Sequence, residues 1–531
     1  MPTHDVLNQV PPLVDYDLAA ADPLLIPVLQ SGAPWAVKQS AEFGREVASA
    51  EGYELGFAAN ENPPQLRTHD RIGNRVDQVE FHPSWHDLLR RSVGAGLHSL
   101  PWENGAETGS HLARAALTFL ASQVEAGHFC PISMTYAVIP ALREQPELSK
   151  RWEPLIVRRE YDPRFAPPAE KDGVLLGMGM TEKQGGSDVR AGTTIAAPDG
   201  QGYRITGHKW FTSAPMNDAF LILAQAPGGL TCFLLPRHSP DGSINQIRIM
   251  RLKAKLGNRS NASAELEFEN AWAERVGEEG RGVATIIEMV NGTRLDCVTG
   301  SAALMRQAVS QAIHHCRHRR AFGSALIDKP AMINVLADLE IETEGAVVLM
   351  ARLAMCFDRS DDPHEQALRR VLTPLAKFHV TKRCTEVVHE ALECLGGNGF
   401  VEESILPRLL RESPLNAIWE GSGNVIALDV LRAARTQPDS AEALRSELAR
   451  GAIGGEALVD RLISADEGEA RQLVEQIALR LQAGLLVDHA SPEVAETFVA
   501  SRISDPSGTR LYGTLPITNK QHSIVERAIP V

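Results

Sequence analysis

The sequence contains few cysteines, and none of them forms a recognisable pair. Its seven cysteines, at positions 130, 232, 297, 316, 356, 384 and 394, are scattered over 531 residues without a C-x-x-C spacing. An odd and scattered set fits buried thiols in a reducing compartment. It argues against a disulfide framework and against a zinc knuckle.

Long hydrophobic runs are also missing. No segment supplies the roughly 20 apolar residues that a membrane-spanning helix needs. The opening stretch, MPTHDVLNQVPPLVDYDLAA, lacks the basic region, apolar core and small-residue cleavage site of a secretory signal. These absences predict a cytoplasmic protein with no membrane partner.

Basic residues are fewer than acidic residues. The 53 lysines and arginines are outnumbered by 67 aspartates and glutamates, which gives a formal net charge of −14. This balance argues against a surface that is basic throughout, although a local basic groove can coexist with it. Residues 437–531 hold nine basic against fourteen acidic side chains, so they show no obvious footprint for a polyanion. A groove assembled from several subunits remains compatible with these numbers.

The chain is too long for a single core, and its patterns divide it. Residues 35–160 have helical periodicity, residues 176–270 form short β-rich runs separated by turn residues, and helical periodicity returns after 277–282. We therefore predict an α+β multidomain protein. Its expected parts are an N-terminal helical domain (1–175), a β domain (176–275), a helical bundle (276–436) and a C-terminal helical extension (437–531).

Two familiar types of site are not predicted. The helical, β, helical order lacks the βαβ alternation of a doubly wound fold, and GMGMTE (177–182) lacks the third glycine of a dinucleotide fingerprint. His314, His315 and His318 form a cluster in which the first and last share a helix face. No carboxylate or cysteine set at matching spacing accompanies them, so no metal is predicted.

Two segments of the β region carry small, hydroxyl and aromatic side chains. MGMTEKQGGSDV (178–189) places Thr181 and Ser187 around a Gly-Gly pair, which can bring hydroxyls and backbone N–H groups close to a ring carbonyl or a phosphate. GHKWFTSAPMNDA (207–219) places Trp210 beside hydroxyls, which suits a flat aromatic cofactor. Taken singly, a surface turn and a core tryptophan are the commoner explanations.

Two more segments lie in the second helical region. LGGNGF (395–400) follows a periodic helix, and its glycines suit either a helix C-cap or the close approach of a ligand. WEGSGN (419–424) places Glu420 beside a tryptophan and three small residues. A carboxylate in a tight apolar setting has its charged form disfavoured, which helps a group that must accept and then hold a proton. A single loop glutamate is more often simply solvated.

Together and in order, these segments resemble the acyl-CoA dehydrogenase family. MGMTEKQGGSDV resembles its T-E-x-x-x-G-S-D loop, KWFTS its W-I-T segment, HRRAFG (318–323) its R-x-x-F-G, LGGNGF its G-G-x-G-[FY] and WEGSGN its Y-E-G-T. Arg411 stands nine residues before Glu420, as in the family. NPPQLR (62–67), RLKAKLGNRSNAS (251–263), PRLLRE and IWEGSGNV are similar to the AidB branch, the alkylation-response flavoproteins that are isovaleryl-CoA dehydrogenase-like. That similarity covers almost the whole chain from LNQ (7–9) onward.

The resemblance implies FAD as cofactor and an acyl-CoA substrate. Cofactor contacts are implied for Met180, Thr181, Ser187, Trp210, Phe211, Thr212, Ser213, Arg319, Gly396, Gly397, Ser422 and Asn424, and substrate contacts for Ser187, Arg294 and Gly421. Glu420 would be the catalytic base, since the alternative family position is Thr293, which offers no acid. Arg319 would meet the FAD pyrophosphate, as guanidinium geometry allows, in a neighbouring subunit of a homotetramer.

Two positions depart from the family pattern. Pro330 replaces a glutamine that contacts the flavin between subunits, and Trp419 replaces a common tyrosine, which would narrow the acyl pocket. Three functions remain open. The first is dehydrogenation of a short or branched acyl-CoA, with an electron-transfer flavoprotein or oxygen as acceptor. The second is a weakly active flavoprotein that binds double-stranded DNA and limits alkylation damage, and the third is a member that keeps flavin only for stability.

Overall fold

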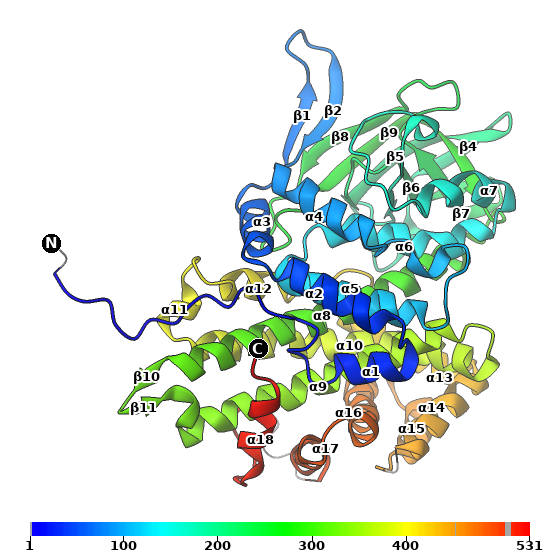
Figure 1. Cartoon of the computed structure of the whole chain (residues 1–531). Coiled ribbons are helices and arrows are strands. Elements are labelled where there is room, and N and C mark those ends of the chain that lie inside the picture. The colour runs from blue at the N-terminus through cyan, green and yellow to red at the C-terminus, as the bar shows by residue number, and fades with distance from the viewer. Residues whose placement is uncertain (1–2, 452, 505–510, 531) are drawn as a thin grey trace. The chain divides into compact units, whose positions relative to one another are not determined.

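The computed structural model describes residues 3–451, 453–504 and 511–530 (Figure 1). The chain forms two compact units. The first contains residues up to 53, 108–124 and those from 295 onward, and the second contains 54–107 and 125–294. The order of helices, then strands, then helices agrees with the predicted fold class. Helices α3 (Ala50–Glu61) and α8 (Gly282–His318) each cross from one unit to the other.

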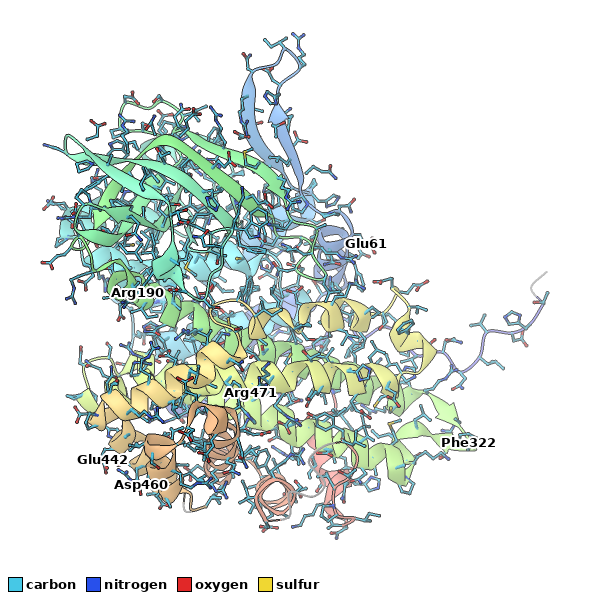
Figure 2. All side chains as sticks on the ribbon, turned by 180° about the vertical axis from the view of Figure 1, so that it is seen from behind. Glu61, Arg190, Phe322, Glu442, Asp460 and Arg471 are labelled. Carbon is cyan, nitrogen blue, oxygen red and sulfur yellow. The ribbon has the colours of Figure 1, made fainter. Side chains whose placement is uncertain are left out.

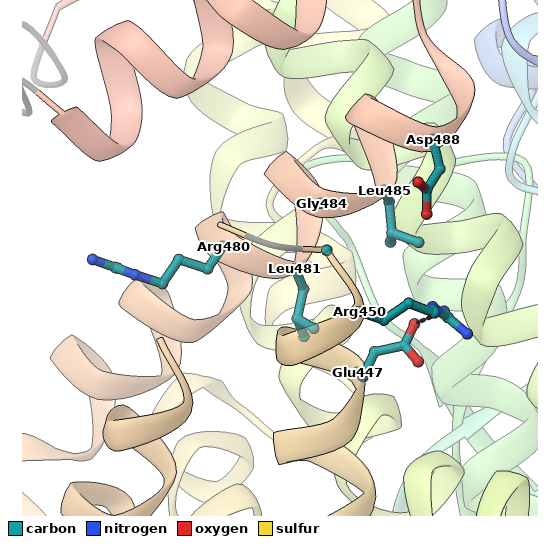
Figure 3. Close-up of a pocket in the computed structure, with 8 residues that line it drawn as sticks. Glu447, Arg450, Arg480, Leu481, Gly484, Leu485 and Asp488 are labelled. Atoms are coloured by element: carbon teal, nitrogen blue, oxygen red, sulfur yellow. Dashed lines mark hydrogen bonds and ion pairs between the residues drawn. The ribbon is translucent and has the colours of Figure 1, made fainter. Parts of the chain in front are cut away.

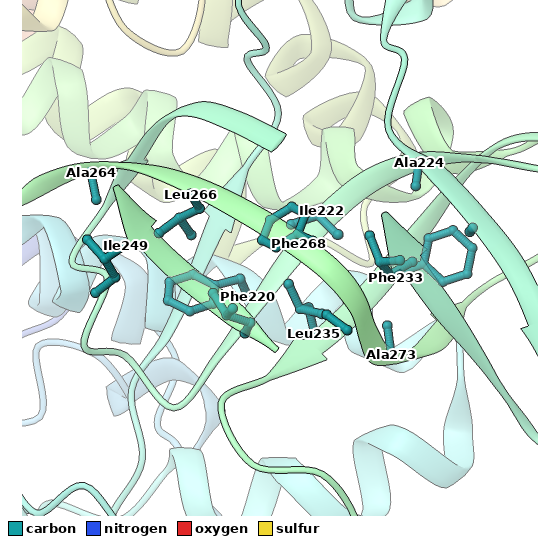
Figure 4. Packing of buried hydrophobic residues seen from close by; sticks show 14 residues of the cluster. Phe220, Ile222, Ala224, Phe233, Leu235, Ile249, Ala264, Leu266, Phe268 and Ala273 are labelled. Atoms are coloured by element: carbon teal, nitrogen blue, oxygen red, sulfur yellow. The ribbon is translucent and has the colours of Figure 1, made fainter. Parts of the chain in front are cut away.

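The second unit is built on a seven-stranded sheet. Its strands are β3 (Leu176–Gly179), β4 (Ile195–Asp199), β5 (Gly202–Ser213), β6 (Ala219–Ala226), β7 (Gly229–Pro236), β8 (Ile247–Leu252) and β9 (Ser263–Val276). They pair in the order β3-β6-β4-β5-β9-β7, with β8 on β9, and β7 also pairs with β6, so the hydrogen bonding returns to β6. Alternation along β9 directs Ala264, Leu266 and Phe268 inward, where they meet Phe220 and Phe233 (Figure 4).

A β-hairpin interrupts the N-terminal region that the sequence predicts as helical. Its strands are β1 (Gln65–His69) and β2 (Arg75–Glu80). The turn is closed by Asp70, whose carboxylate accepts hydrogen bonds from the backbone of Ile72 and Asn74, and by Gly73 at φ 94°. Leu66 and Val79 pack against the core of the sheet. The broad helical pattern on both sides obscured this short alternation.

The remaining elements of the second unit are helical. They are α4 (Pro83–Gly94), η1 (Leu100–Trp102), α6 (Phe129–Arg143), α7 (Pro146–Ile156), η2 (Pro168–Glu170) and η3 (Val189–Ala191). Helix α6 packs against β3. Thr135 on α6 accepts a hydrogen bond from the N–H of Leu176 at 2.9 Å, which fixes the start of the strand that leads to Thr181.

The first unit is almost entirely helical. Its elements up to the end of the bundle are α1 (Leu25–Gly32), α2 (Ala36–Val47), α5 (Ser110–Val124), β10 (Arg320–Ala321), β11 (Ser324–Ala325), η4 (Leu326–Asp328), α9 (Pro330–Asp358), α10 (Pro363–Cys394), α11 (Gly397–Phe400), α12 (Leu406–Glu412), η5 (Leu415–Ala417) and α13 (Gly423–Thr436). The C-terminal extension adds α14 (Pro438–Arg450), α15 (Glu456–Ser464), η6 (Glu467–Glu469), α16 (Ala470–His489), α17 (Pro492–Val499), the short π-helix η7 (Ala500–Ser504) and α18 (Lys520–Arg527). Helices α9 and α10 pack along each other, and α16 packs against both.

Buried ion pairs join the extension to α9. Four carboxylates on one stretch of α9 are fully buried: Asp338, Glu340, Glu342 and Glu344. Arg502 pairs with Asp338 and Glu342, and Arg527 Nη1 lies 2.9 Å from Glu344 Oε1. Removing one partner of a buried pair costs about 3–5 kcal/mol, because a charge is left without compensation. These pairs therefore hold the extension firmly to the bundle.

Two buried histidines make this unit sensitive to acid. Burial lowers the pKa of His111 from 6.5 to about 3 and that of His379 from 6.5 to about 4. Below pH 6.5 these histidines bind protons in the unfolded chain but not in the folded protein. The free energy of unfolding therefore decreases as the pH is lowered, until the pKa of the folded state is reached. We expect His379 alone to remove about 3 kcal/mol of unfolding free energy between pH 6.5 and 4. Chemical denaturation at several pH values measures this loss.

The matched variants separate His379 from the general effect of acid. His379→Gln should flatten the dependence on pH, whereas His522→Gln, at an exposed position, should leave it as in the wild type. Equal slopes in all three proteins would contradict this assignment.

Two further expectations concern the cysteines and membrane-spanning helices. All seven cysteine thiols are buried, as predicted. Among the described residues, no helix combines the length and the apolar composition needed to cross a bilayer.

Candidate functional site

In the second unit, the loop after β3 lies against β5. The N–H of Trp210 donates to the carbonyl of Thr181 at 2.7 Å, which joins the two predicted cofactor segments directly. A Cβ on Gly186 would lie 2.4 Å from Thr181 Oγ1, so the close approach of the loop to Thr181 requires glycine there. The structure thus brings together Thr181 and Trp210. Ser187 lies on the exposed part of the same loop.

A buried ion pair fixes this junction, and the sequence did not predict it. Lys209 Nζ lies 2.7 Å from Glu182 Oε1 and also donates to the carbonyl of Leu223. Glu182 accepts further hydrogen bonds from the backbone of Thr193 and Thr194. Burial opposes the ionisation of Glu182, but these donors outweigh it and hold its pKa well below the usual range. Because Glu182 adjoins Thr181 and Lys209 adjoins Trp210, one buried pair holds both predicted cofactor segments.

Positive charge surrounds the indole of Trp210. Lys253 Nζ lies 3.4 Å from the ring centroid, and Arg251 and Lys183 lie 5.5 Å and 5.6 Å away. Glu265 pairs with two of these three cations, Lys253 and Arg251. Cations at these distances are attracted to the ring, and their excess charge favours an anionic ligand nearby.

The neighbouring predicted residues differ in exposure. Thr212 is fully buried, and its Oγ1 has no hydrogen-bond partner among the described residues. A buried hydroxyl in that state costs about 1–3 kcal/mol, so a ligand that bonds to it would remove a penalty. Phe211 is 52% exposed, Met180 is half-buried, and Ser213 Oγ lies 3.4 Å from Ser263 Oγ.

In the first unit, Glu420 occupies an unusual backbone conformation. Its φ is 59°, in the left-handed region, and Gly421 follows at φ 104°. A residue other than glycine in that region costs of order 1–3 kcal/mol and persists only where the surroundings impose it. The Glu420 side chain is half-buried. Backbone strain of this kind collects at functional positions, which supports a functional role for Glu420.

The surroundings that impose this conformation centre on Lys377 of α10. Its buried Nζ donates to the carbonyls of Asn416 and Gly421, at 3.0 and 2.8 Å, on either side of Glu420. Asn416 in turn accepts from Trp419 Nε1 at 2.9 Å and donates to Ser301 Oγ. Neither Lys377 nor Asn416 was identified from the sequence. A lysine inside the apolar run VLTPLAKFHV was the available signal.

Removing this lysine should misplace Glu420. We expect Lys377→Met to lower the rate of flavin reduction by an acyl-CoA by about 10²-fold, since a shift of about 1 Å has that effect. Bound flavin should be retained. The rate is measured by anaerobic stopped flow against Lys150→Met, which removes an exposed lysine. A Lys377→Met rate equal to that of the control would show that Lys377 does not position Glu420.

The other predicted residues of the helical region lie on exposed turns. Gly396 has φ 58°, and a Cβ on Gly396 or Gly397 would meet open space, so the backbone is accessible there. Ser422 is the exposed N-cap of α13. Asn424 Oδ1 accepts from Nη1 of Arg471 on α16 at 3.0 Å. Arg471 is labelled in Figure 2. The extension therefore contacts the WEGSGN segment.

The two predicted site arginines, Arg319 and Arg294, lie in different environments. Arg319 lies where α8 gives way to the β10–β11 hairpin, at whose tip Phe322 is 96% exposed (Figure 2). Arg294, in the second unit, is buried on α8 beside Thr293, whose hydroxyl donates to the carbonyl of Val290. Pro330 begins α9, a position where its missing N–H has no cost.

The histidine cluster makes backbone contacts. His314 Nε2 is 2.8 Å from the carbonyl of Pro11, and His318 Nδ1 is 2.9 Å from that of His314. Within the part of the chain that the structure describes, no group of three metal-binding side chains could hold a metal ion.

A hollow lies between α14 and α16 (Figure 3). It is lined by Glu447, Arg450, Gly451, Arg480, Leu481, Gly484, Leu485 and Asp488. A Cβ on Gly451 would lie 2.7 Å from Gly484 Cα, so glycines allow the two segments to cross closely. The hollow arises from this crossing and contains no predicted site residue.

Comparison with known proteins identifies the family. Residues 8–163 match the AidB N-terminal domain of adaptive response proteins, 177–271 the acyl-CoA dehydrogenase middle domain and 280–434 its C-terminal domain. AidB of Escherichia coli is 44% identical over 521 residues, which cover 96% of each chain. The chain belongs to the acyl-CoA dehydrogenase family. Within it, the matched N-terminal domain and this relative agree with the predicted AidB branch.

Other acyl-CoA dehydrogenases are similar over most of their length. Acyl-CoA dehydrogenase family member 11 of Caenorhabditis elegans is 32% identical over 505 residues, covering 85% of this chain and 79% of that protein. The crystal structure of Caenorhabditis elegans ACDH-11 in complex with C11-CoA superposes with a TM-score of 0.84 at 27% identity, covering 99% of this chain and 93% of that one. The Caenorhabditis elegans protein therefore has the same fold as this chain over almost its whole length.

Proposed function

We propose that this protein is an FAD-dependent acyl-CoA dehydrogenase that oxidises a short or branched acyl-CoA. The observation that carries the proposal is the geometry of Glu420. Its carboxylate stands in a left-handed turn that Lys377 holds from both sides, within the segment where the family keeps its base. A strained and closely supported carboxylate is better explained by catalysis than by solvation.

The residues present fit FAD. The Thr212 hydroxyl, buried without a partner among the described residues, and the cations around Trp210 suit a polar and anionic ligand. The residues that would hold FAD are Met180, Thr181, Ser187, Trp210, Phe211, Thr212, Ser213, Arg319, Gly396, Gly397, Ser422 and Asn424. When bound, FAD supplies the hydride acceptor that no amino-acid side chain provides.

The protein's own groups handle the proton and the thioester. The Glu420 carboxylate would take the α-proton, and FAD, when bound, would supply the acceptor for the β-hydride, so that the substrate would lose two hydrogens and gain a double bond. The N–H of Glu420 polarises the thioester carbonyl, which makes the α-proton more acidic. Ser187, Arg294 and Gly421 would contact the substrate.

Trp419 bears on the size of the substrate. Its indole is fixed by the 2.9 Å hydrogen bond to Asn416 Oδ1, beside Glu420. We infer that this ring shortens the acyl pocket and favours short or branched chains. The C11-CoA complex of the Caenorhabditis elegans relative supports a CoA thioester as the substrate class. An electron-transfer flavoprotein or oxygen would reoxidise the flavin, and we propose a homotetrameric, cytoplasmic protein.

The alternative, in which DNA binding limits alkylation damage, has less support. Two arginines of the extension are neutralised by ion pairs: Arg445 pairs with Glu442 and Asp460, and Arg450 with Glu447. Glu442 and Asp460 are labelled in Figure 2. We expect no retardation of duplex DNA by this protein at moderate salt. Strong, salt-dependent retardation would favour the alternative.

Flavin binding and reduction test the proposal. The purified protein is reconstituted with FAD, and its visible spectrum should show one flavin per chain. Anaerobic addition of isovaleryl-CoA and other short acyl-CoAs should bleach that spectrum. A protein that binds no flavin, or whose flavin no acyl-CoA reduces, would contradict the proposal.

A further inference from the structure

The N-terminal arm, defined here as residues 3–12, contacts the β10–β11 hairpin through Asn8. The side chain of Asn8 donates through Nδ2 to the carbonyl of Arg320 and accepts through Oδ1 from its N–H, both at 2.9 Å. One side chain thus makes both hydrogen bonds that a neighbouring strand would make. Asn8 itself has φ 58°, a conformation that asparagine tolerates better than most residues.

The backbone of Asn8 also contacts Arg319. Arg319 Nη1 donates to the carbonyl of Asn8, and His314 Nε2 lies 2.8 Å from the carbonyl of Pro11. The arm therefore spans from the last turn of α8 to the start of the hairpin. The hairpin has only two residues in each strand, too few to be stable without such support.

We propose that Asn8 is a positioning residue for flavin binding, which acts by orienting the Arg319 guanidinium and the base of its hairpin. This inference rests on the proposed function, in which Arg319 meets the FAD pyrophosphate. A guanidinium carries five N–H donors, so the one given to Asn8 leaves the others for a phosphate. An arginine already held in one orientation loses less conformational freedom on binding than a mobile one.

Substitution of Asn8 tests the inference, and substitution of Gln9, on the same arm, serves as the control. Asn8→Ala should raise the Kd for FAD about 3- to 10-fold, while Gln9→Ala, at the adjacent exposed position, should leave it unchanged. The Kd is measured by titrating flavin-free protein with FAD. Hydrogen exchange of the Arg320 N–H, followed without flavin, should be faster in Asn8→Ala than in Gln9→Ala.

A double-mutant cycle shows whether Asn8 acts through Arg319. Arg319→Ala should weaken FAD binding, and adding Asn8→Ala to it should cause little further loss. Additive losses would overturn the inference, as would faster exchange at Arg320 with an unchanged Kd, because Asn8 would then be only structural. Absence of FAD binding by the wild type would overturn the proposed function as well. Normal binding by both the wild type and Asn8→Ala would overturn the inference alone.

Discussion

Glu420→Gln is expected to slow the reduction of bound flavin by a short acyl-CoA by about 10²- to 10⁴-fold. The amide has nearly the same shape as the carboxylate but cannot accept the α-proton. The backbone contacts of the Glu420 loop come from Lys377 and involve carbonyl groups, so they remain in the variant. FAD content and thermal stability should therefore stay close to those of the wild type.

The control for Glu420→Gln is Glu403→Gln, which makes the same chemical change at an exposed position. Both variants are loaded with FAD and mixed anaerobically with isovaleryl-CoA in a stopped-flow instrument. Bleaching in Glu420→Gln at the rate of the control would show that another group removes the proton.

Lys209→Met should destabilise the protein by about 3–5 kcal/mol. The substitution leaves the Glu182 carboxylate buried at 1% side-chain exposure without its ammonium partner. The Leu223 carbonyl also loses a donor. Because the pair holds both cofactor segments, FAD affinity should fall as well. The loss of stability is measured by denaturant unfolding of the flavin-free protein.

Two further variants test the origin of that loss. Replacing both partners, in Glu182→Leu with Lys209→Met, should be milder than the single change, since no charge stays buried. Arg204→Met breaks an ion pair with Asp199 whose members are 45% and 50% exposed, and should cost less than about 1 kcal/mol. Equal losses in Lys209→Met and Arg204→Met would contradict the assigned role of the buried pair.

The sequence predicted those parts of the fold that periodicity controls. Strict alternation in AELEFE identified β9, and the apolar spacing of residues 384–395 identified the end of α10. The β1–β2 hairpin was missed because its strands have five and six residues and lie within a helical region. Short alternation carries little signal against such a background.

The candidate site residues Glu420, Thr181 and Trp210 were predicted from local motifs and stay predictions. The residues that support them were not predicted. Lys377 reaches the carbonyl of a residue 44 positions later, and Asn8 contacts a residue 312 positions later. Contacts at such separations leave no local pattern. The left-handed φ of Glu420 could not be predicted from the sequence either, because glycine, asparagine and aspartate are the residues that usually adopt it.

The most direct test of the central claim, α-proton removal coupled to flavin reduction, is an isotope experiment. Flavin-loaded protein is mixed anaerobically with isovaleryl-CoA that carries either hydrogen or deuterium at the α-carbon, and the visible absorbance of the flavin is followed. We expect both substrates to bleach the flavin and the deuterated one to do so more slowly. Absence of bleaching, or equal rates with the two substrates, would contradict that claim.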